Sequence, residues 1–182
     1  MNARAFGLLL FVATAARAES ALDRALSDLW RGTTPAERDK ATSAVIAAGA
    51  DFDLVYARLK AGPRYRKDVK TGLVEESRKG ARFREQYVFL VPKDYDPSNE
   101  YRVSFYLHGG VNRRDPWEKG DPWWRRFDRM EDADQISVFP SSWRGSLWWQ
   151  PDQIENLKAI LDRLKTDYNV DENRVYLSLI HI

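Results

Sequence analysis

The sequence contains no cysteine and only two histidines, His108 and His181. Without cysteine the chain cannot form a disulfide bond, a thiolate metal site or a cysteine nucleophile. Two histidines are too few for a histidine-rich metal site, so we expect no metal, and nothing in the sequence calls for an organic cofactor. The folded protein is therefore expected to be stabilised by burial alone.

The apolar run near the N-terminus is too short to cross a bilayer, which needs about 20 residues. It covers residues 6–16, follows Arg4, and ends at Ala-Arg-Ala, the small-x-small pattern that a signal peptidase recognises. The pattern predicts a cleaved signal peptide over residues 1–18 and a mature chain that begins at Glu19. It predicts a secreted or periplasmic protein with no stable membrane insertion after cleavage.

A charge excess of either sign is also missing. Removal of residues 1–18 leaves 27 Lys and Arg against 27 Asp and Glu. A near-neutral chain has no electrostatic reason to bind nucleic acid or an anionic membrane, so neither partner is expected. The sequence does not indicate an oligomeric state.

Residues 19–62 have the pattern of a helical N-terminal extension. Leucines at helical spacing before residue 31 predict a first helix. Thr34, proline at the next position and Glu37 combine a capping box with a favoured helix start, and predict a second helix. A third helix is expected to begin near Asp51 and to end at Gly62. We interpret this extension as a domain without chemistry of its own.

From residue 63 to residue 182 strand and helix patterns alternate. Strands are predicted at residues 72–77, 83–91, 101–107, 136–139 and 174–178. The clearest helix covers Pro151–Tyr168. It has an apolar stripe along one side, made of Ile154, Leu157, Ile160, Leu161, Leu164 and Tyr168. Strands that alternate with a long helix predict an α/β domain with a mostly parallel sheet and right-handed crossovers.

The strand at 101–107 leads directly into His108, Gly109, Gly110 and Val111. Two glycines after a strand allow a sharp turn and leave backbone N–H groups exposed. Such donors can form an oxyanion hole, in which one donor is worth roughly 3–4 kcal/mol of transition-state stabilisation. We predict that these four residues form an oxyanion-hole loop that His108 helps to fix; a purely structural glycine turn is the alternative.

The run from Phe89 to Gly110, FLVPKDYDPSNEYRVSFYLHGG, resembles the opening of several branches of the α/β-hydrolase superfamily. These are secreted esterases, polyhydroxybutyrate-depolymerase-like enzymes and prolyl-oligopeptidase-like enzymes, although Arg102 stands where many members carry proline. The resemblance extends more loosely to Ser178. It implies a three-layer α/β-hydrolase-type sandwich, of which this chain holds the N-terminal half of the sheet.

In such enzymes the last predicted strand leads into a nucleophile elbow, Gly-x-Ser-x-Gly, and the triad acid and histidine follow later. Here Leu179 stands where the first elbow glycine belongs, and His181 stands where the serine belongs. Ser178 lacks flanking glycines and is expected to be buried or paired on its strand, and His181 has nothing to orient it.

The resemblance therefore implies a C-terminally truncated chain. Its full-length parent would be an exported serine esterase that uses a Ser-His-Asp/Glu triad on a small or polymeric carboxylic ester. The 182-residue chain itself is expected to be inactive.

Six of the seven tryptophans lie between positions 117 and 149. The loops that carry them follow predicted strands, and open α/β sheets bind ligands beyond the carboxyl ends of their strands. We predict substrate contacts from Trp117, Trp143, Trp148, Trp149 and Arg113. The alternatives are a packing role for the tryptophans and surface ion pairs for the arginine.

Two other functions fit the same features. A prolyl-oligopeptidase-type peptidase shares the early motifs, and an assay of ester against peptide hydrolysis separates it from an esterase. A non-catalytic carbohydrate-binding module would use the tryptophans without a nucleophile. Its binding of a polysaccharide would survive loss of the Gly109–Gly110 turn, but not loss of Trp148 or Trp149.

Overall fold

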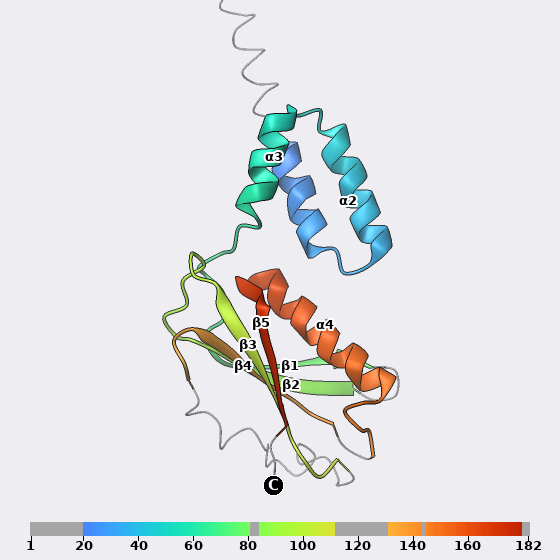
Figure 1. Ribbon diagram of the computed structural model, residues 1–182, viewed down its shortest axis with the longest axis vertical. Helices are drawn as coiled ribbons and strands as arrows, with labels where there is room; N and C mark the ends of the chain where they lie inside the picture. Colours follow the sequence, from blue (N-terminus) through green and yellow to red (C-terminus); the bar gives the residue numbers. More distant parts are fainter. Residues whose placement is uncertain (1–19, 81–83, 112–130, 143–144, 180–182) are drawn as a thin grey trace, which may run out of the picture. The chain divides into compact units, whose positions relative to one another are not determined.

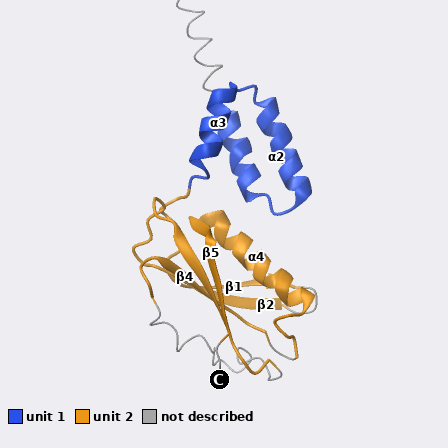
Figure 2. Cartoon of the chain, viewed as in Figure 1, with its two compact units in different colours: residues 1–64 blue, residues 65–182 orange. Residues whose placement is uncertain are grey.

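The computed structural model describes residues 20–80, 84–111, 131–142 and 145–179 of the chain. The chain divides into two compact units, with the boundary between Arg64 and Tyr65 (Figure 2).

The described part of the first unit contains three helices, at residues 20–31, α2 (Pro35–Ala47) and α3 (Phe52–Ala61). The capping box predicted at the start of α2 is present. The Glu37 backbone N–H donates to Thr34 Oγ1 at 3.3 Å, and the Thr34 backbone N–H donates to Glu37 Oε2 at 3.0 Å. These reciprocal bonds satisfy two backbone donors that the first helical turn would otherwise leave without a partner.

Helix α3 presents an open aromatic pair. Phe52 and Tyr56 are 77% and 57% exposed, and their rings stack at a centroid distance of 6.2 Å. Residues four apart on a helix lie on the same face, so the stacking follows from the spacing. No residue of α3 is buried, so Phe52 and Tyr56 are not core positions of the described structure.

The second unit is built on a five-stranded mixed sheet. The strands are β1 (Gly72–Lys79), β2 (Arg84–Val91), β3 (Tyr101–Leu107), β4 (Gln135–Pro140) and β5 (Val170–Leu179), in the order β1-β2-β4-β3-β5 (Figure 1). Strand β2 pairs antiparallel with both β1 and β4, whereas β4, β3 and β5 are parallel. The α/β class predicted from the sequence is confirmed, but the sheet is mixed rather than mostly parallel, because two of its four described strand pairs are antiparallel.

Helix α4 (Pro151–Asp167) connects β4 to β5 and packs on one face of the sheet (Figure 1). Its buried residues Ile160 and Leu164 join a core with Phe89 and Phe105, and none of the four is more than 2% exposed. Full burial of such a side chain contributes about 1.5–3 kcal/mol. This layer holds the central strands, and therefore the loops at their carboxyl ends, in place.

A smaller apolar cluster lies on the opposite face. It contains Val88, Leu90 and Phe139, and the Tyr106 ring stacks on Phe139 at 5.4 Å. Among the described residues no helix belongs to this cluster, so the third layer of the predicted sandwich stays a prediction.

Two local predictions were wrong. Strand β5 begins at Val170 rather than at Arg174, because a register shift in its pairing with β3 accommodates residues that looked like a turn. On α4 the predicted apolar stripe included Ile154, which is 43% exposed. The buried residues of the first turns are instead Gln153 and Asn156.

No helix in the described parts of the chain combines the length and the apolar character needed to cross a membrane. The predicted signal peptide, residues 1–18, lies outside the described residues.

Candidate functional site

The predicted oxyanion loop directly follows β3, a central strand between β4 and β5. Gly110 has φ = 71°, a left-handed conformation that only glycine adopts without strain. His108 is buried, whereas Gly109, Gly110 and Val111 are partly exposed. The backbone N–H groups of Gly110 and Val111 donate to no other group among the described residues. Two donors without an acceptor in the described part of the chain therefore lie at the carboxyl end of a central strand.

The His108 ring is fixed by hydrogen bonds at both nitrogens. Nε2 lies 2.9 Å from the Ser142 backbone N–H and accepts from it, so the proton resides on Nδ1, which donates to the Gly109 carbonyl at 2.8 Å. Burial disfavours the imidazolium ion and lowers the pKa of His108 to about 4. The ring is therefore neutral at pH 7 and joins the Gly109 carbonyl to the Ser142 backbone N–H, whereas its part in an oxyanion hole stays a prediction.

A second loop follows β4, and its described residues are 141–142 and 145–150. It is hydrogen-bonded to the oxyanion loop, residues 108–111. The Trp148 indole N–H donates to the His108 carbonyl at 2.9 Å, and the Gly145 backbone N–H donates to the Val111 carbonyl at 2.9 Å. The Trp148 and His108 rings also meet edge to face at 5.2 Å. Together with the hydrogen bond from Ser142, these contacts hold the oxyanion loop at His108 and at Val111. None of them uses the N–H groups of Gly110 and Val111.

The predicted substrate-binding residues occupy different environments. Trp148 is 8% exposed and uses its indole N–H within the protein, whereas Trp149 is 71% exposed. Arg113, Trp117 and Trp143 lie outside the described residues. Substrate contact stays a prediction for all five, and of the two described tryptophans Trp149 has the more open surface for it.

No serine of the described residues has the geometry of an activated nucleophile. Ser178 is paired on β5 rather than buried, and its side chain is exposed because β5 is the edge strand of the described sheet. It pairs in register with Tyr106, and no hydrogen bond joins it to a described histidine. The Ser142 hydroxyl donates to the Ser146 carbonyl at 2.6 Å, so only the backbone of Ser142 serves the His108 ring. His181 lies outside the described residues.

Sequence reasoning missed a buried polar cluster beneath the N-terminal half of α4. Glu85, Gln153 and Asn156 are 6%, 1% and 0% exposed. Gln153 Nε2 donates to Ser146 Oγ at 3.0 Å and faces both Glu85 carboxylate oxygens at 3.4 and 3.5 Å. Burial raises the pKa of the Glu85 carboxyl. This cluster touches the second loop through Ser146.

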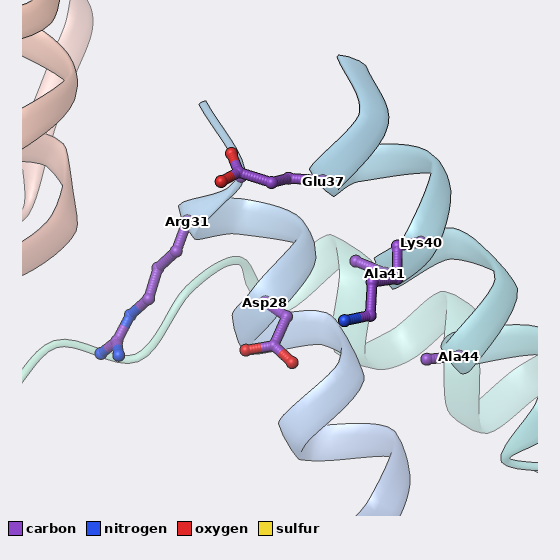
Figure 3. A pocket seen from close by; sticks show the side chains of 7 residues that line it. Asp28, Arg31, Glu37, Lys40, Ala41 and Ala44 are labelled. Carbon is purple, nitrogen blue, oxygen red and sulfur yellow. The ribbon is translucent and has the colours of Figure 1, made fainter. Parts of the chain in front are cut away.

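Two surface hollows are lined by residues that belong to neither of these loops. Figure 3 shows one of about 300 Å³ in the helical unit, with Asp28 and Arg31 from helix 20–31 and Lys40 from α2 along its walls. Glu37 also lines this hollow, but its carboxylate already accepts a hydrogen bond from the Thr34 backbone N–H at the start of α2. A more polar hollow of about 560 Å³ lies where β3 begins, beside Tyr101. Ligands of open α/β sheets bind at the opposite ends of the strands, so this second hollow does not extend the candidate site.

The described residues contain no group of three or more histidine, aspartate or glutamate side chains that could hold a metal ion. The chemistry available at the two loops is hydrogen-bond donation from fixed backbone N–H groups.

Comparison with known proteins gives structural likenesses only. No protein-family model and no curated protein matches the chain. A thermostable esterase is 22% identical with a TM-score of 0.44, and covers 60% of this chain and 34% of its own length. The esterase Est2 of Thermogutta terrifontis is 16% identical with a TM-score of 0.43, and covers 59% of this chain and 40% of its own.

A provisionally assigned dipeptidyl aminopeptidase IV of Bacteroides ovatus is 20% identical with a TM-score of 0.41, and covers 59% of this chain and 17% of its own. The chain thus spans less than half the length of these proteins. Likenesses this distant establish neither the family nor the activity of the chain, and the function is argued below from the loops.

Proposed function

We propose that this chain supplies the oxyanion-hole side of the active site of an exported serine hydrolase that acts on carboxylic esters. The observation that carries the proposal is the pair of N–H groups at Gly110 and Val111, which donate to no group in the described ranges of the chain. The loop that presents them is held by three hydrogen bonds from the loop after β4.

These donors suit the chemistry of acyl transfer. When a nucleophile attacks an ester carbonyl, negative charge develops on the carbonyl oxygen. Fixed donors stabilise that charge without having to reorganise during the reaction, and loss of one donor costs about 3–4 kcal/mol of transition-state stabilisation. The positive φ of Gly110 and the bonds to His108 fix the donors before a substrate binds. The reaction needs no metal and no cofactor.

The proposed reaction also needs a serine, a histidine and an acid, and we assign them to residues of the parent protein beyond position 182. Strand β5 runs parallel to β3 and pairs with it as far as Leu107–Leu179. A nucleophile turn that follows β5 would therefore present its serine beside the loop that follows β3. The histidine would accept the serine proton, and the acid would orient the histidine.

The test is hydrolysis of p-nitrophenyl acetate by two proteins. The 182-residue chain is expected to give no turnover, whereas a protein extended in frame through a downstream Gly-x-Ser-x-Gly is expected to hydrolyse the ester. In the extended protein, Gly110→Ala should lower kcat by about 10²–10³ because it displaces a donor. Turnover by the short chain that Ser178→Ala abolishes would refute the assignment, and so would a downstream sequence with no elbow.

One observation favours a second candidate, a carbohydrate-binding module. The exposed Trp149 indole offers a flat apolar face to a sugar ring. Polysaccharide binding that is lost in Trp149→Ala and unchanged in Gly110→Ala would support this candidate over the hydrolase. Peptide hydrolysis in place of ester hydrolysis would identify the site as that of a peptidase.

A further inference from the structure

We propose that Gln153, on α4, is a positioning residue for the oxyanion loop, which it reaches through Ser146, Ser142 and His108. The catalytic meaning of this inference rests on the proposed function, whereas the mechanical coupling does not. None of the four residues is more than 5% exposed.

The connection is a continuous series of short contacts. The Gln153 Nε2 group donates to Ser146 Oγ at 3.0 Å, and the Ser146 carbonyl accepts from Ser142 Oγ at 2.6 Å. The Ser142 backbone N–H then donates to His108 Nε2 at 2.9 Å. Each bond lies within normal hydrogen-bond geometry. Movement of the Gln153 side chain would therefore be transmitted to the ring that orients the loop.

Gln153 is itself tied to the sheet. Its second Nε2 hydrogen faces the Glu85 carboxylate, which is carried by β2. The same strand accepts a backbone bond from the second loop, because the Ser141 N–H donates to the Gln86 carbonyl at 3.0 Å. The second loop is thus fixed to β2 at two points, and Gln153 supplies the one made by a side chain.

A packing role alone does not account for the amide of Gln153. Its Oε1 atom is buried and has no hydrogen-bond partner among the described residues. An unsatisfied buried polar atom is costly, and an apolar side chain at this position would avoid the cost. The retained amide has one evident structural use, which is to join Ser146 to Glu85.

Asn156 provides a matched control on the same helix. It is 0% exposed and also has one buried atom without a partner among the described residues, Nδ2. Its Oδ1 accepts from Arg78 Nη1 at 3.1 Å, a bond to β1 and not to either loop. Replacement of Asn156 therefore removes a buried amide of the same helix without breaking the connection to His108.

The experiment compares Gln153→Met with Asn156→Leu by hydrogen exchange in NMR spectra of the full 182-residue chain. The reporters are the Ser142 and Gly145 amides and the Trp148 indole N–H, with the Phe105 amide as a reference for global stability. In Gln153→Met the loop reporters should exchange about five- to tenfold faster relative to Phe105. In Asn156→Leu the same ratio should stay unchanged.

Equal changes in the two variants would show a merely structural role and would overturn the proposal, as would unchanged loop exchange in Gln153→Met. Ser146→Ala is a second, milder variant that removes the acceptor Oγ and should accelerate exchange at the same reporters. If Gln153→Met does not fold, the exchange rates of the loop reporters in Ser146→Ala decide whether the proposal holds. Because no readout depends on turnover, the inference can fail or hold whether or not the protein hydrolyses esters.

Discussion

Acidification should destabilise the second unit through His108, and the effect can be worked out from its burial. The folded protein holds the ring neutral, with a pKa lowered from 6.5 to about 4 because burial disfavours the imidazolium ion. The unfolded chain binds a proton near pH 6.5. Between these two values the unfolded state binds more protons than the folded state, so the stability falls as the pH falls.

The magnitude follows from the two pKa values. Linkage predicts that His108 leaves the stability almost unchanged at pH 7, lowers it by about 2 kcal/mol at pH 5, and by about 3 kcal/mol at pH 4. A total stability of 5–15 kcal/mol is usual for a protein, so a loss of this size is a large fraction of it.

The assay is urea unfolding at pH 7, 6, 5 and 4, followed by tryptophan fluorescence, which reports mainly on the second unit because six of the seven tryptophans lie there. The matched variant is His108→Gln, whose side-chain oxygen can still accept from the Ser142 N–H but does not titrate. Other carboxyls titrate in both proteins, so the difference between them isolates His108. A difference that does not change between pH 7 and pH 5 would refute the reasoning.

Three further predictions concern stability and are measured by urea or thermal unfolding. Gly110→Ala should cost about 1–2 kcal/mol because it forces a side chain into the left-handed region. Gly109→Ala, where φ is not positive, should cost less, and an equal cost would contradict the strain argument. Phe105→Ala should cost about 3–5 kcal/mol through the cavity it leaves, whereas Leu177→Ala, at a position 62% exposed, should stay within about 0.5 kcal/mol. Thr34→Ala should cost the helical unit about 1 kcal/mol by removing the cap of α2, and unchanged helicity and melting by circular dichroism would argue against that role.

The elements that the sequence predicted well are those whose signals are local. The helix starts at Thr34 and Pro151 rest on capping and proline rules that act within one turn, and both helices begin where those rules place them. The bounds of β3 follow from a β-forming run that ends at Leu107, which only His108 separates from the two glycines. The bounds of β5 depend on its partner strand, and a register shift against β3 is not visible in the sequence of β5 alone.

The site was predictable only in part, for a similar reason. The turn after β3 carries its own signal in Gly109 and Gly110, and the positive φ at Gly110 agrees with it. The role of Trp148 as a hydrogen-bond donor to His108 depends on how two loops meet in space. Tryptophan content indicates apolar surface but does not say whether an indole N–H faces a ligand or the protein.

The buried face of α4 gives the strongest argument that these two loops form one unit. An apolar stripe is the pattern that a helix needs in order to pack on a sheet, and Ile160 and Leu164 meet it. One and two turns earlier the same face carries Asn156 and Gln153, both buried, and burial of a polar group is costly unless it is hydrogen-bonded. The Nε2 group of Gln153 meets that condition through Ser146, a residue of the loop that holds His108, whereas its Oε1 has no partner among the described residues. The apolar C-terminal half of α4 therefore supports the sheet. Its polar N-terminal half supports the second loop, and through it the oxyanion loop.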